Sequence, residues 1–164
     1  MLNRVAAEAD WNTPLGPNRG RGIALQKSFG SIVGQVVEVT IEAGRLRVDR
    51  VVAVIDPGFA VSPDGLKAQI ESGVIYGLTA ALYGEITIEA GAVVQSNFHD
   101  YRAIRMDEAP RIQTFIINSG ADMGGAGEPG VPAVAPALAN AIFNATGRRI
   151  RTLPLMKTDF STLG

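Results

Sequence analysis

The sequence predicts an α+β fold: a mixed β-sheet with β-hairpins and two principal helices. Three observations predict this class. The chain has 164 residues, about the size of one domain. With 46% hydrophobic and 19% charged residues, it can bury a core. Strand-like and helix-like patterns also follow one another as strands, helix, strands, helix and strand, which favours α+β over a doubly wound sheet.

The first predicted unit is a hairpin. Between residues 37 and 42, apolar and polar residues alternate with the period of a strand that has one wet face. Ala43 and Gly44 then supply a tight turn, and the return strand begins with the same alternation. It continues into an apolar run at residues 51–55, which predicts burial on both faces. We expect the outer, wet face of this hairpin to carry Glu opposite Arg.

Two longer helices are expected. The first follows Ser62, which can cap the orphan amides, has Pro63 at its first position, and runs to about Tyr83. The second follows a long loop at residues 118–130 and ends at Gly147, a natural left-handed cap. Both have apolar residues at helical spacing, so each has one face in the core.

Proline and glycine residues mark where the N-terminal segment gives way to the main domain. Residues 1–10 read as a short helix and residues 11–22 as an extended connector rich in Pro and Gly, so we place the α+β domain at residues 23–164. Further strands are expected at residues 112–117 and 150–155.

Two local patterns complete the assignment. The pentapeptide Thr-Ile-Glu-Ala-Gly occurs at residues 40–44 and again at 87–91, which indicates one hairpin turn used twice. Gly73 and Gly77 lie four apart on the first long helix. They allow another backbone or a ligand to approach closely, or they allow tight packing on the sheet.

Composition excludes several classes of function. A net charge of -1 gives no basic field for nucleic acid, and no apolar run approaches a membrane span, so we expect neither nucleic acid nor membrane contact by this segment. The absence of Cys excludes disulfides and thiolate metal sites, and a single His, His99, excludes a multi-His metal site. The sequence assigns no compartment.

The strongest candidate for a functional site is the glycine-rich loop that precedes the second long helix. Its glycines can turn backbone amides toward a ligand, and Glu128 lies among them. Glu128 could act as a general base if burial raises its pKa, or it could simply satisfy helix amides. Residues 125–130 also match a dinucleotide fingerprint, with Arg148 and Arg149 available for a 2′-phosphate of NADP, although the predicted strand ends too early for that motif.

Two side chains elsewhere were weighed in the same way. Gln69 lies on the core-facing helix, where its amide could donate to and accept from a heterocyclic ligand, or could be a buried Gln satisfied by backbone. His99 could shuttle protons, but no nucleophile accompanies it, so a structural role is the better interpretation.

Several segments resemble a known family. They are AQIESGVIYG at residues 68–77, NFHDY at 97–101, and GGAGEPGVPAVAPALANAIF at 124–143, followed by TGRRI at 146–150. Together they resemble the molybdenum-binding large subunit of the xanthine dehydrogenase and aldehyde oxidase family, above all the isoquinoline 1-oxidoreductase β-subunit type. Those subunits are several times longer, so the resemblance is to their C-terminal molybdenum-binding domain.

The resemblance implies a function and a site. It implies a molybdenum hydroxylase that oxidises an aldehyde or an N-heterocycle at an electron-poor carbon with water-derived oxygen. Glu128 is implied as the catalytic base that takes a proton from a metal-activated hydroxyl. Gln69, Gly125, Ala126 and Gly127 are implied contacts to the molybdopterin, with no protein ligand to the metal.

The resemblance also implies partners. They are the remainder of the large subunit, an iron–sulfur small subunit and a small-molecule substrate, and we expect the isolated chain to be inactive. Two alternatives stay open: a non-catalytic binding or assembly module with the same fold, and an NADP-binding domain.

Overall fold

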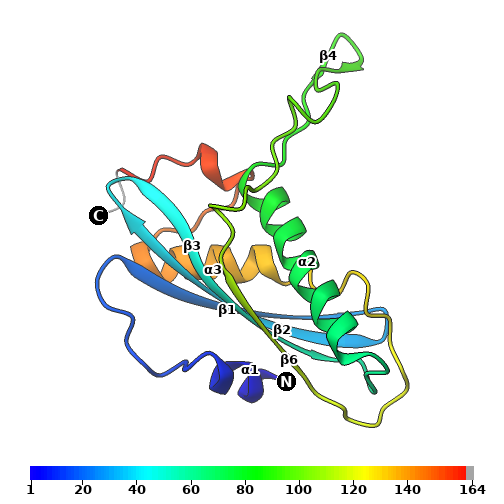
Figure 1. The fold of residues 1–164 in the computed structure, drawn as a ribbon. Helices are drawn as coiled ribbons and strands as arrows, with labels where there is room; N and C mark the ends of the chain where they lie inside the picture. Colours follow the sequence, from blue (N-terminus) through cyan, green and yellow to red (C-terminus); the bar gives the residue numbers. More distant parts are fainter. Residues whose placement is uncertain (162–164) are drawn as a thin grey trace.

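The computed structural model describes residues 1–161 of the chain and consists of one main sheet with helices on both faces (Figure 1). In chain order the elements are α1 (Leu2–Glu8), β1 (Arg19–Ser28), β2 (Ser31–Glu42), β3 (Arg45–Asp56), α2 (Pro63–Leu82), β4 (Ile88–Glu89), β5 (Ala92–Val93), β6 (Arg111–Ile116), α3 (Val134–Thr146) and the 3₁₀ helix η1 (Leu155–Lys157).

The main sheet has the strand order β1-β2-β3-β6. The first three strands are antiparallel, and β6 pairs parallel to β3 after a crossover that contains α2. The sheet is therefore mixed, and the predicted α+β class is confirmed. Residues 51–55 are fully buried on both faces, as their apolar run predicted, because helices pack on both faces of the sheet at this point.

The two long helices cover one face of the sheet and the short helix covers the other (Figure 1). Odd-numbered residues of β2 and of the part of β3 after the residue-50 position, such as Val37 and Val51, join the core beneath α2 and α3. Even-numbered residues, such as Val36 and Val52, pack with Val5 of α1. The short N-terminal helix was predicted, and it closes the second face of the sheet.

Strand β1 was not predicted, because its buried positions are not marked by apolar residues. It begins at Arg19, inside the segment that we expected to be a connector. Gly20 and Gly22 lie directly beneath α3: a Cβ atom on either would overlap the carbonyl oxygen of Ala141 or Ala137, respectively. The strand is thus buried by the absence of side chains, which no alternation of apolar residues reports.

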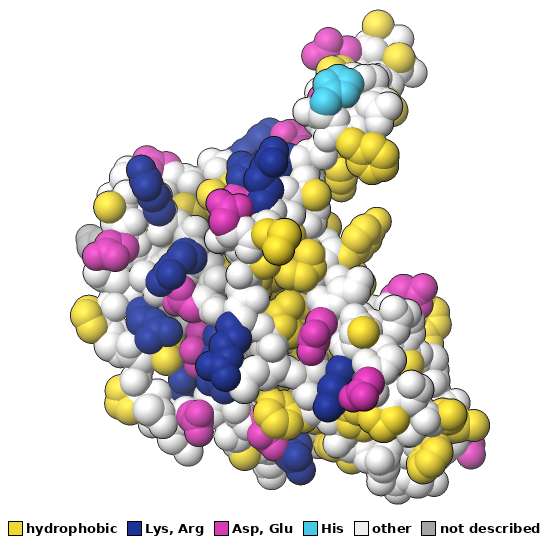
Figure 2. All heavy atoms as spheres, viewed as in Figure 1, with side chains coloured by type: hydrophobic (Ala, Val, Ile, Leu, Met, Phe, Trp, Pro, Cys, Tyr) yellow, Lys and Arg dark blue, Asp and Glu magenta, His cyan; other side chains and the backbone are white. Residues whose placement is uncertain are grey.

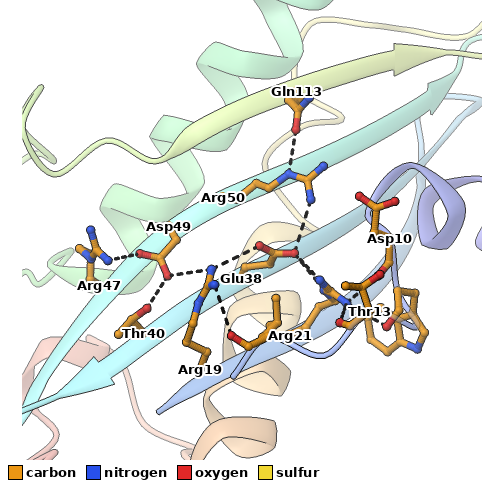
Figure 3. A network of polar contacts seen from close by, with 12 residues as sticks. Asp10, Thr13, Arg19, Arg21, Glu38, Thr40, Arg47, Asp49, Arg50 and Gln113 are labelled. Atoms are coloured by element: carbon orange, nitrogen blue, oxygen red, sulfur yellow. Dashed lines mark hydrogen bonds and ion pairs between the residues drawn. The ribbon is translucent and has the colours of Figure 1, made fainter. Parts of the chain in front are cut away.

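The outer face of the β2–β3 hairpin is wet near its turn, where exposed Glu42 lies opposite exposed Arg45, but it is buried around Glu38, which corrects our expectation for that part. Glu38 is only 4% exposed and Arg21 of β1 only 8%. The Arg21 guanidinium donates to Glu38 Oε1 through Nε at 2.9 Å and Nη2 at 2.7 Å. Its Nη1 also donates to the carbonyl oxygens of Asp10, Trp11 and Thr13, so the connector is held over the charged pair (Figure 3).

A β-bulge extends this network along the sheet. Between the pairs Glu38–Arg50 and Val39–Val48, residue Asp49 of β3 is extra. Asp49 accepts a hydrogen bond from Thr40 Oγ1 at 2.6 Å, while Arg50 donates to Gln113 Oε1 at 2.7 Å (Figure 3). The predicted pairing of Glu with Arg is therefore present: it is exposed at Glu42 and Arg45, and it is buried at Glu38.

Both long helices are confirmed, with differences at their beginnings. Ser62 is the N-cap of α2, but its side chain makes no capping hydrogen bond; its carbonyl oxygen accepts from Leu66 N. Helix α3 begins at Val134, which places Pro136 in its first turn, where amides have no intrahelical acceptor and a proline is tolerated. Gly147 ends α3 with φ of 70°, as predicted.

The strand expected at residues 150–155 is absent, and this prediction was wrong. The segment is irregular and leads into η1. Pro154 has no amide hydrogen for a strand ladder, Leu153 is exposed, and Leu155 is the residue of this segment that is buried in the core. The expected α+β domain also includes residues 162–164, which lie outside the described residues.

Residues 84–110 form an arm that projects from the end of α2 (Figure 1). The second Thr-Ile-Glu-Ala-Gly copy makes the short β4–β5 hairpin of this arm. Large apolar side chains of the arm are exposed, Phe98 by 93% and Met106 by 97%, and Figure 2 shows hydrophobic groups along it. No helix among residues 1–161 is both long and apolar enough to span a bilayer.

Candidate functional site

The glycine-rich loop between β6 and α3, yellow in Figure 1, runs across two other turns of the sheet. Gly120 N donates to Gly58 O at 3.0 Å and Gly124 N to Pro57 O at 3.0 Å, just after β3. Gly125 N donates to the carbonyl oxygen of Phe29 at 2.6 Å, in the turn between β1 and β2. We call residues 124–131 the glutamate loop, because Glu128 lies within it.

Two buried side chains of β2 hold the glutamate loop from below. Ser31 Oγ donates to the carbonyl oxygen of Gly125 at 2.6 Å. Gln35 Nε2 donates to the carbonyl oxygen of Gly130 at 2.7 Å. Neither residue was singled out in the sequence. A signal existed, because Ser31 and Gln35 occupy the odd-numbered positions of β2 that otherwise carry core-facing Val and Ile.

The downstream end of the glutamate loop lies against α2. A Cβ atom on Gly73 would approach Gly130 Cα to 3.1 Å, and one on Gly130 would approach Ile70 O to 2.7 Å. A Cβ on Gly77 would meet Val134 Cγ1 at 2.5 Å. Gly73 and Gly77 therefore allow another backbone segment to approach α2, as one of the two predicted roles requires. That segment is the glutamate loop with the start of α3, and it is not the sheet.

The structure brings three of the predicted cofactor-binding residues to one surface hollow of about 330 Å³. Gln69, Ala126 and Gly127 line it. A Cβ atom on Gly127 would lie 3.8 Å from Gln69 Nε2, so the carboxamide faces the loop. Gln69 is exposed and its side chain makes no hydrogen bond within residues 1–161, so the alternative of a buried, satisfied Gln is wrong.

Gly125 and Glu128 lie beside this hollow and do not line it. A Cβ on Gly125 would contact Phe29 at 2.8 Å, so this glycine lets the loop approach the β1–β2 turn. The Glu128 side chain is exposed. The backbone carbonyl oxygen of Glu128 accepts a hydrogen bond from Val131 N at 2.9 Å. Helix α3 begins only at Val134 and has no side-chain cap, so Glu128 does not satisfy its amides.

The middle of the loop presents unpaired donors. Within the described part of the chain, the backbone amides of Ala126, Gly127 and Glu128 have no hydrogen-bond acceptor. Three successive free amides beside a free carboxamide form a donor set suited to a ligand rich in oxygen and ring nitrogen.

The other sequence candidates lie elsewhere. His99 is in the arm, 3.6 Å from Asp100, and both side chains belong to the projecting part of the molecule (Figure 2). Arg148 and Arg149 follow the C-terminal end of α3, whereas the glutamate loop precedes its N-terminal end, about 20 Å away for a helix of this length. The two parts of the NADP pattern therefore do not share one site.

A second polar cluster lies where the arm leaves α2. Burial, together with a hydrogen bond to Glu108, raises the pKa of Tyr83 to about 12. The guanidinium of Arg102 lies over the Tyr83 ring at 3.9 Å. This cluster fixes the base of the arm. Among residues 1–161, no group of three or more His, Asp or Glu side chains is arranged to bind a metal ion.

The fold is shared with solved oxidoreductases. The quinoline 2-oxidoreductase of Pseudomonas putida 86 superposes with a TM-score of 0.69 over 76% of this chain and 17% of that chain, at 22% identity. The aldehyde oxidoreductase of Desulfovibrio desulfuricans ATCC 27774 does so with a TM-score of 0.64 over 76% of this chain and 14% of that chain, at 23% identity. At this identity the likeness shows the fold.

Sequence relatives agree with this class. The chain is 33% identical over 160 residues to the isoquinoline 1-oxidoreductase subunit beta of Brevundimonas diminuta, covering 94% of this chain and 20% of the relative. It is 35% identical over 167 residues to a membrane-bound aldehyde dehydrogenase of Gluconacetobacter polyoxogenes, covering 97% of this chain and 22% of the relative. The chain thus spans about one fifth of the length of these relatives.

The family model of the molybdopterin cofactor-binding domain matches residues 4–110. The chain belongs to this family, and the resemblance found in the sequence is confirmed. The matched part includes Gln69 and ends before the glutamate loop, so the role of Glu128 depends on other arguments.

Proposed function

We propose that this chain is part of a molybdenum hydroxylase that oxidises an aldehyde or an N-heterocycle at an electron-poor carbon, with water as the source of oxygen. The observation that carries the proposal is the glutamate loop: it is fixed at both ends and presents free amides and Glu128 beside the Gln69 hollow. The chain belongs to the molybdopterin cofactor-binding family through residues 4–110, a part that includes Gln69 and precedes the loop.

The residues around the hollow fit molybdopterin. A pterin offers ring nitrogens and carbonyl oxygen as acceptors, and the amides of Ala126 and Gly127 are donors without an acceptor of their own. The Gln69 carboxamide can both donate and accept, and it makes no competing hydrogen bond within residues 1–161. Gly127 leaves the space beside Gln69 that a larger side chain would fill. We propose Gln69, Gly125, Ala126 and Gly127 as the cofactor-binding residues, Gly125 through the backbone path that it permits.

Glu128 is the proposed base. In the overall reaction, a substrate C–H bond becomes C–OH, water supplies the oxygen, and two electrons and two protons leave. The molybdenum cofactor, when bound, supplies the acceptor for the two electrons. The carboxylate of Glu128 accepts one proton, a step that places it next to the attacking oxygen.

The exposure of Glu128 is consistent with a site completed by further chain. A carboxylate is an efficient base when its surroundings exclude water and raise its pKa toward the working pH. This chain spans about one fifth of its relatives, and we propose that the remainder of a large subunit covers the glutamate loop. An iron–sulfur small subunit is the proposed receiver of the electrons, and the isolated chain is expected to be inactive.

The arm supports the same arrangement and also the alternative function. Several large apolar side chains are exposed together on it, Phe98 and Met106 among them, and such a group indicates a surface that is covered in an assembly. A non-catalytic assembly module would expose the same arm and would retain no molybdenum.

The test uses the complete subunit, purified with its partner. Elemental analysis is expected to find molybdenum, and Glu128→Gln is expected to keep the metal while the oxidation rate falls by roughly 10²- to 10⁴-fold, the usual contribution of a general base. Asp122→Asn is the matched control, because it neutralises another exposed carboxylate between β6 and α3 that lies outside the glutamate loop. A full rate in Glu128→Gln would remove the base assignment, and a metal-free complete subunit would favour the assembly module.

A further inference from the structure

Gln35 is buried where the sequence pattern calls for an aliphatic residue. The odd-numbered residues of β2 face α2 and α3, and Val33 and Val37 on either side of Gln35 are fully buried. Gln35 itself is 0% exposed. Its Oε1 atom has no hydrogen-bond partner within residues 1–161, so this carboxamide is only partly satisfied in the core. Burial of a carboxamide with an unpaired oxygen is unfavourable, so core packing alone does not explain why this position carries Gln.

The hydrogen bond that Gln35 does make is directed at the glutamate loop. Its Nε2 donates to the carbonyl oxygen of Gly130, two residues after Glu128, at 2.7 Å. On the other side, Gly130 touches the backbone of α2 so closely that it has no room for a Cβ atom. Gly130 is therefore held between Gln35 and α2, in one position.

Ser31 makes the equivalent bond at the upstream end. It is also 0% exposed, and its hydroxyl donates to the carbonyl oxygen of Gly125. Ser31 and Gln35 are four residues apart on one face of β2, and their two acceptors are five residues apart in the loop. The segment between these acceptors contains the three free amides and Glu128. Its shape thus depends on its two ends: the amides of residues 126–128 have no acceptor within residues 1–161, and the hydrogen bond that Glu128 O accepts comes from Val131, at the downstream end.

We propose that Gln35 is a positioning residue for the glutamate loop: through Gly130 it fixes where Glu128 and the preceding amides lie. This inference rests on the proposed function for its catalytic consequence, although the anchoring itself can be measured without any activity. Gln35 touches neither substrate nor cofactor. It acts by keeping the base within the narrow range of positions that proton transfer requires.

The first experiment measures amide hydrogen exchange in the 164-residue chain. Val131 N donates to Glu128 O, so its amide reports the closed loop, and the Val54 amide in β3 reports the sheet. Gln35→Met keeps the length of the side chain and removes the donor. We expect the exchange rate of Val131, taken relative to Val54, to rise by about tenfold or more, because the loop opens without unfolding of the sheet.

Val36→Ala is the matched control. Val36 is the next residue of β2 and faces α1, so this variant weakens the sheet without touching the loop. It is expected to speed exchange at both amides and to leave their ratio unchanged. Gln35→Asn is the second test variant: it keeps the carboxamide, shortens its reach by one methylene, and is also expected to raise the ratio. An unchanged ratio in either folded Gln35 variant overturns the proposal.

The second experiment uses the complete subunit with its partner. Gln35→Met is expected to lower kcat by roughly 10- to 100-fold, as for a displaced catalytic group, with a much smaller change in KM and unchanged molybdenum content. An unaltered kcat together with a raised exchange ratio would show that the loop is anchored by Gln35 but that Glu128 is not the base. That outcome would refute the proposed function and leave the anchoring role in place.

Discussion

The pentapeptide Thr-Ile-Glu-Ala-Gly occurs twice in this chain, and the two copies lie in hairpins of very different length. In both copies the Ala and the Gly have positive φ, 50° and 74° at residues 43 and 44 and 48° and 79° at residues 90 and 91. Both therefore make the same two-residue hairpin turn. The first turn joins β2 and β3, of twelve residues each, whereas the second joins β4 and β5, of two residues each.

The difference lies in what surrounds the strands. Ile41 of the first copy is 6% exposed and belongs to the core beneath the long helices, whereas Ile88 of the second is 69% exposed. Strand β2 has β1 as a second neighbour, but β4 pairs with β5 alone. The five residues thus specify a turn, and the partners available on either side decide how far the strands extend and what they bury.

The largest expected contrast concerns buried and exposed ion pairs. Arg21→Met leaves Glu38 of β2 with a weaker set of cationic partners beneath the connector, and we expect unfolding free energy to fall by about 3–5 kcal/mol. Arg102→Met removes a half-exposed pair with Glu108 in the arm and is expected to cost about 0–1 kcal/mol. Urea denaturation of both variants measures the difference. Equal losses would mean that the buried network does not distinguish the first hairpin from the arm.

The second contrast is between the two isoleucines of the repeated pentapeptide. Ile41→Ala opens a cavity in the main core, and we expect a loss of about 2–5 kcal/mol. Ile88→Ala changes a surface side chain and is expected to alter the stability of the 164-residue chain by less than about 0.5 kcal/mol. Thermal and urea unfolding provide the measurement. A large effect at Ile88 would show that the arm packs on the body in solution.

The smallest expected effect is a local titration in the arm. Hydrogen bonds from the Asn97 and Ser96 amides lower the pKa of Asp100 to about 2. Because the folded pKa lies below the unfolded value, the carboxylate supports the arm above the unfolded pKa, and this support is lost as the pH falls through about 2. A carboxyl NMR titration of Asp100 should have its midpoint there. A midpoint near 3.8, with the two amides unshifted, would contradict the turn at residues 96–100.

Elements set by local signals could be predicted from the sequence. The turn at Ala43 and Gly44, the start of α2 at Pro63 and the end of α3 at Gly147 each depend on backbone preferences that neighbouring residues reveal. Strand β1 could not be predicted in this way, because its burial depends on a helix more than a hundred residues later in the chain. The burial of Glu38 on the otherwise wet face of the first hairpin was missed for a similar reason: the connector that covers Glu38 is positioned by Arg21, outside the hairpin.

The structure brings three of the five predicted site residues to one hollow, and the side chains that support the loop were not predicted. Gln69, Ala126 and Gly127 were proposed from their types and from the family resemblance, and the structure brings them to one hollow. The roles of Gln35 and Ser31 depend on the path of the glutamate loop over β2, which sequence spacing does not reveal. The alternation of β2 could have indicated both residues. They stand at alternate positions that otherwise carry buried aliphatic residues, and a buried polar residue needs a hydrogen-bond partner.

The bare backbone at positions 20 and 22 has a consequence for mutational scanning. Helix α3 rests on β1 there without intervening side chains, and α3 also receives the end of the glutamate loop. Even alanine at either position would lift the helix and move that end. A saturation mutagenesis screen for cofactor retention should therefore rank these two remote glycines among its most intolerant sites, although neither comes near the hollow.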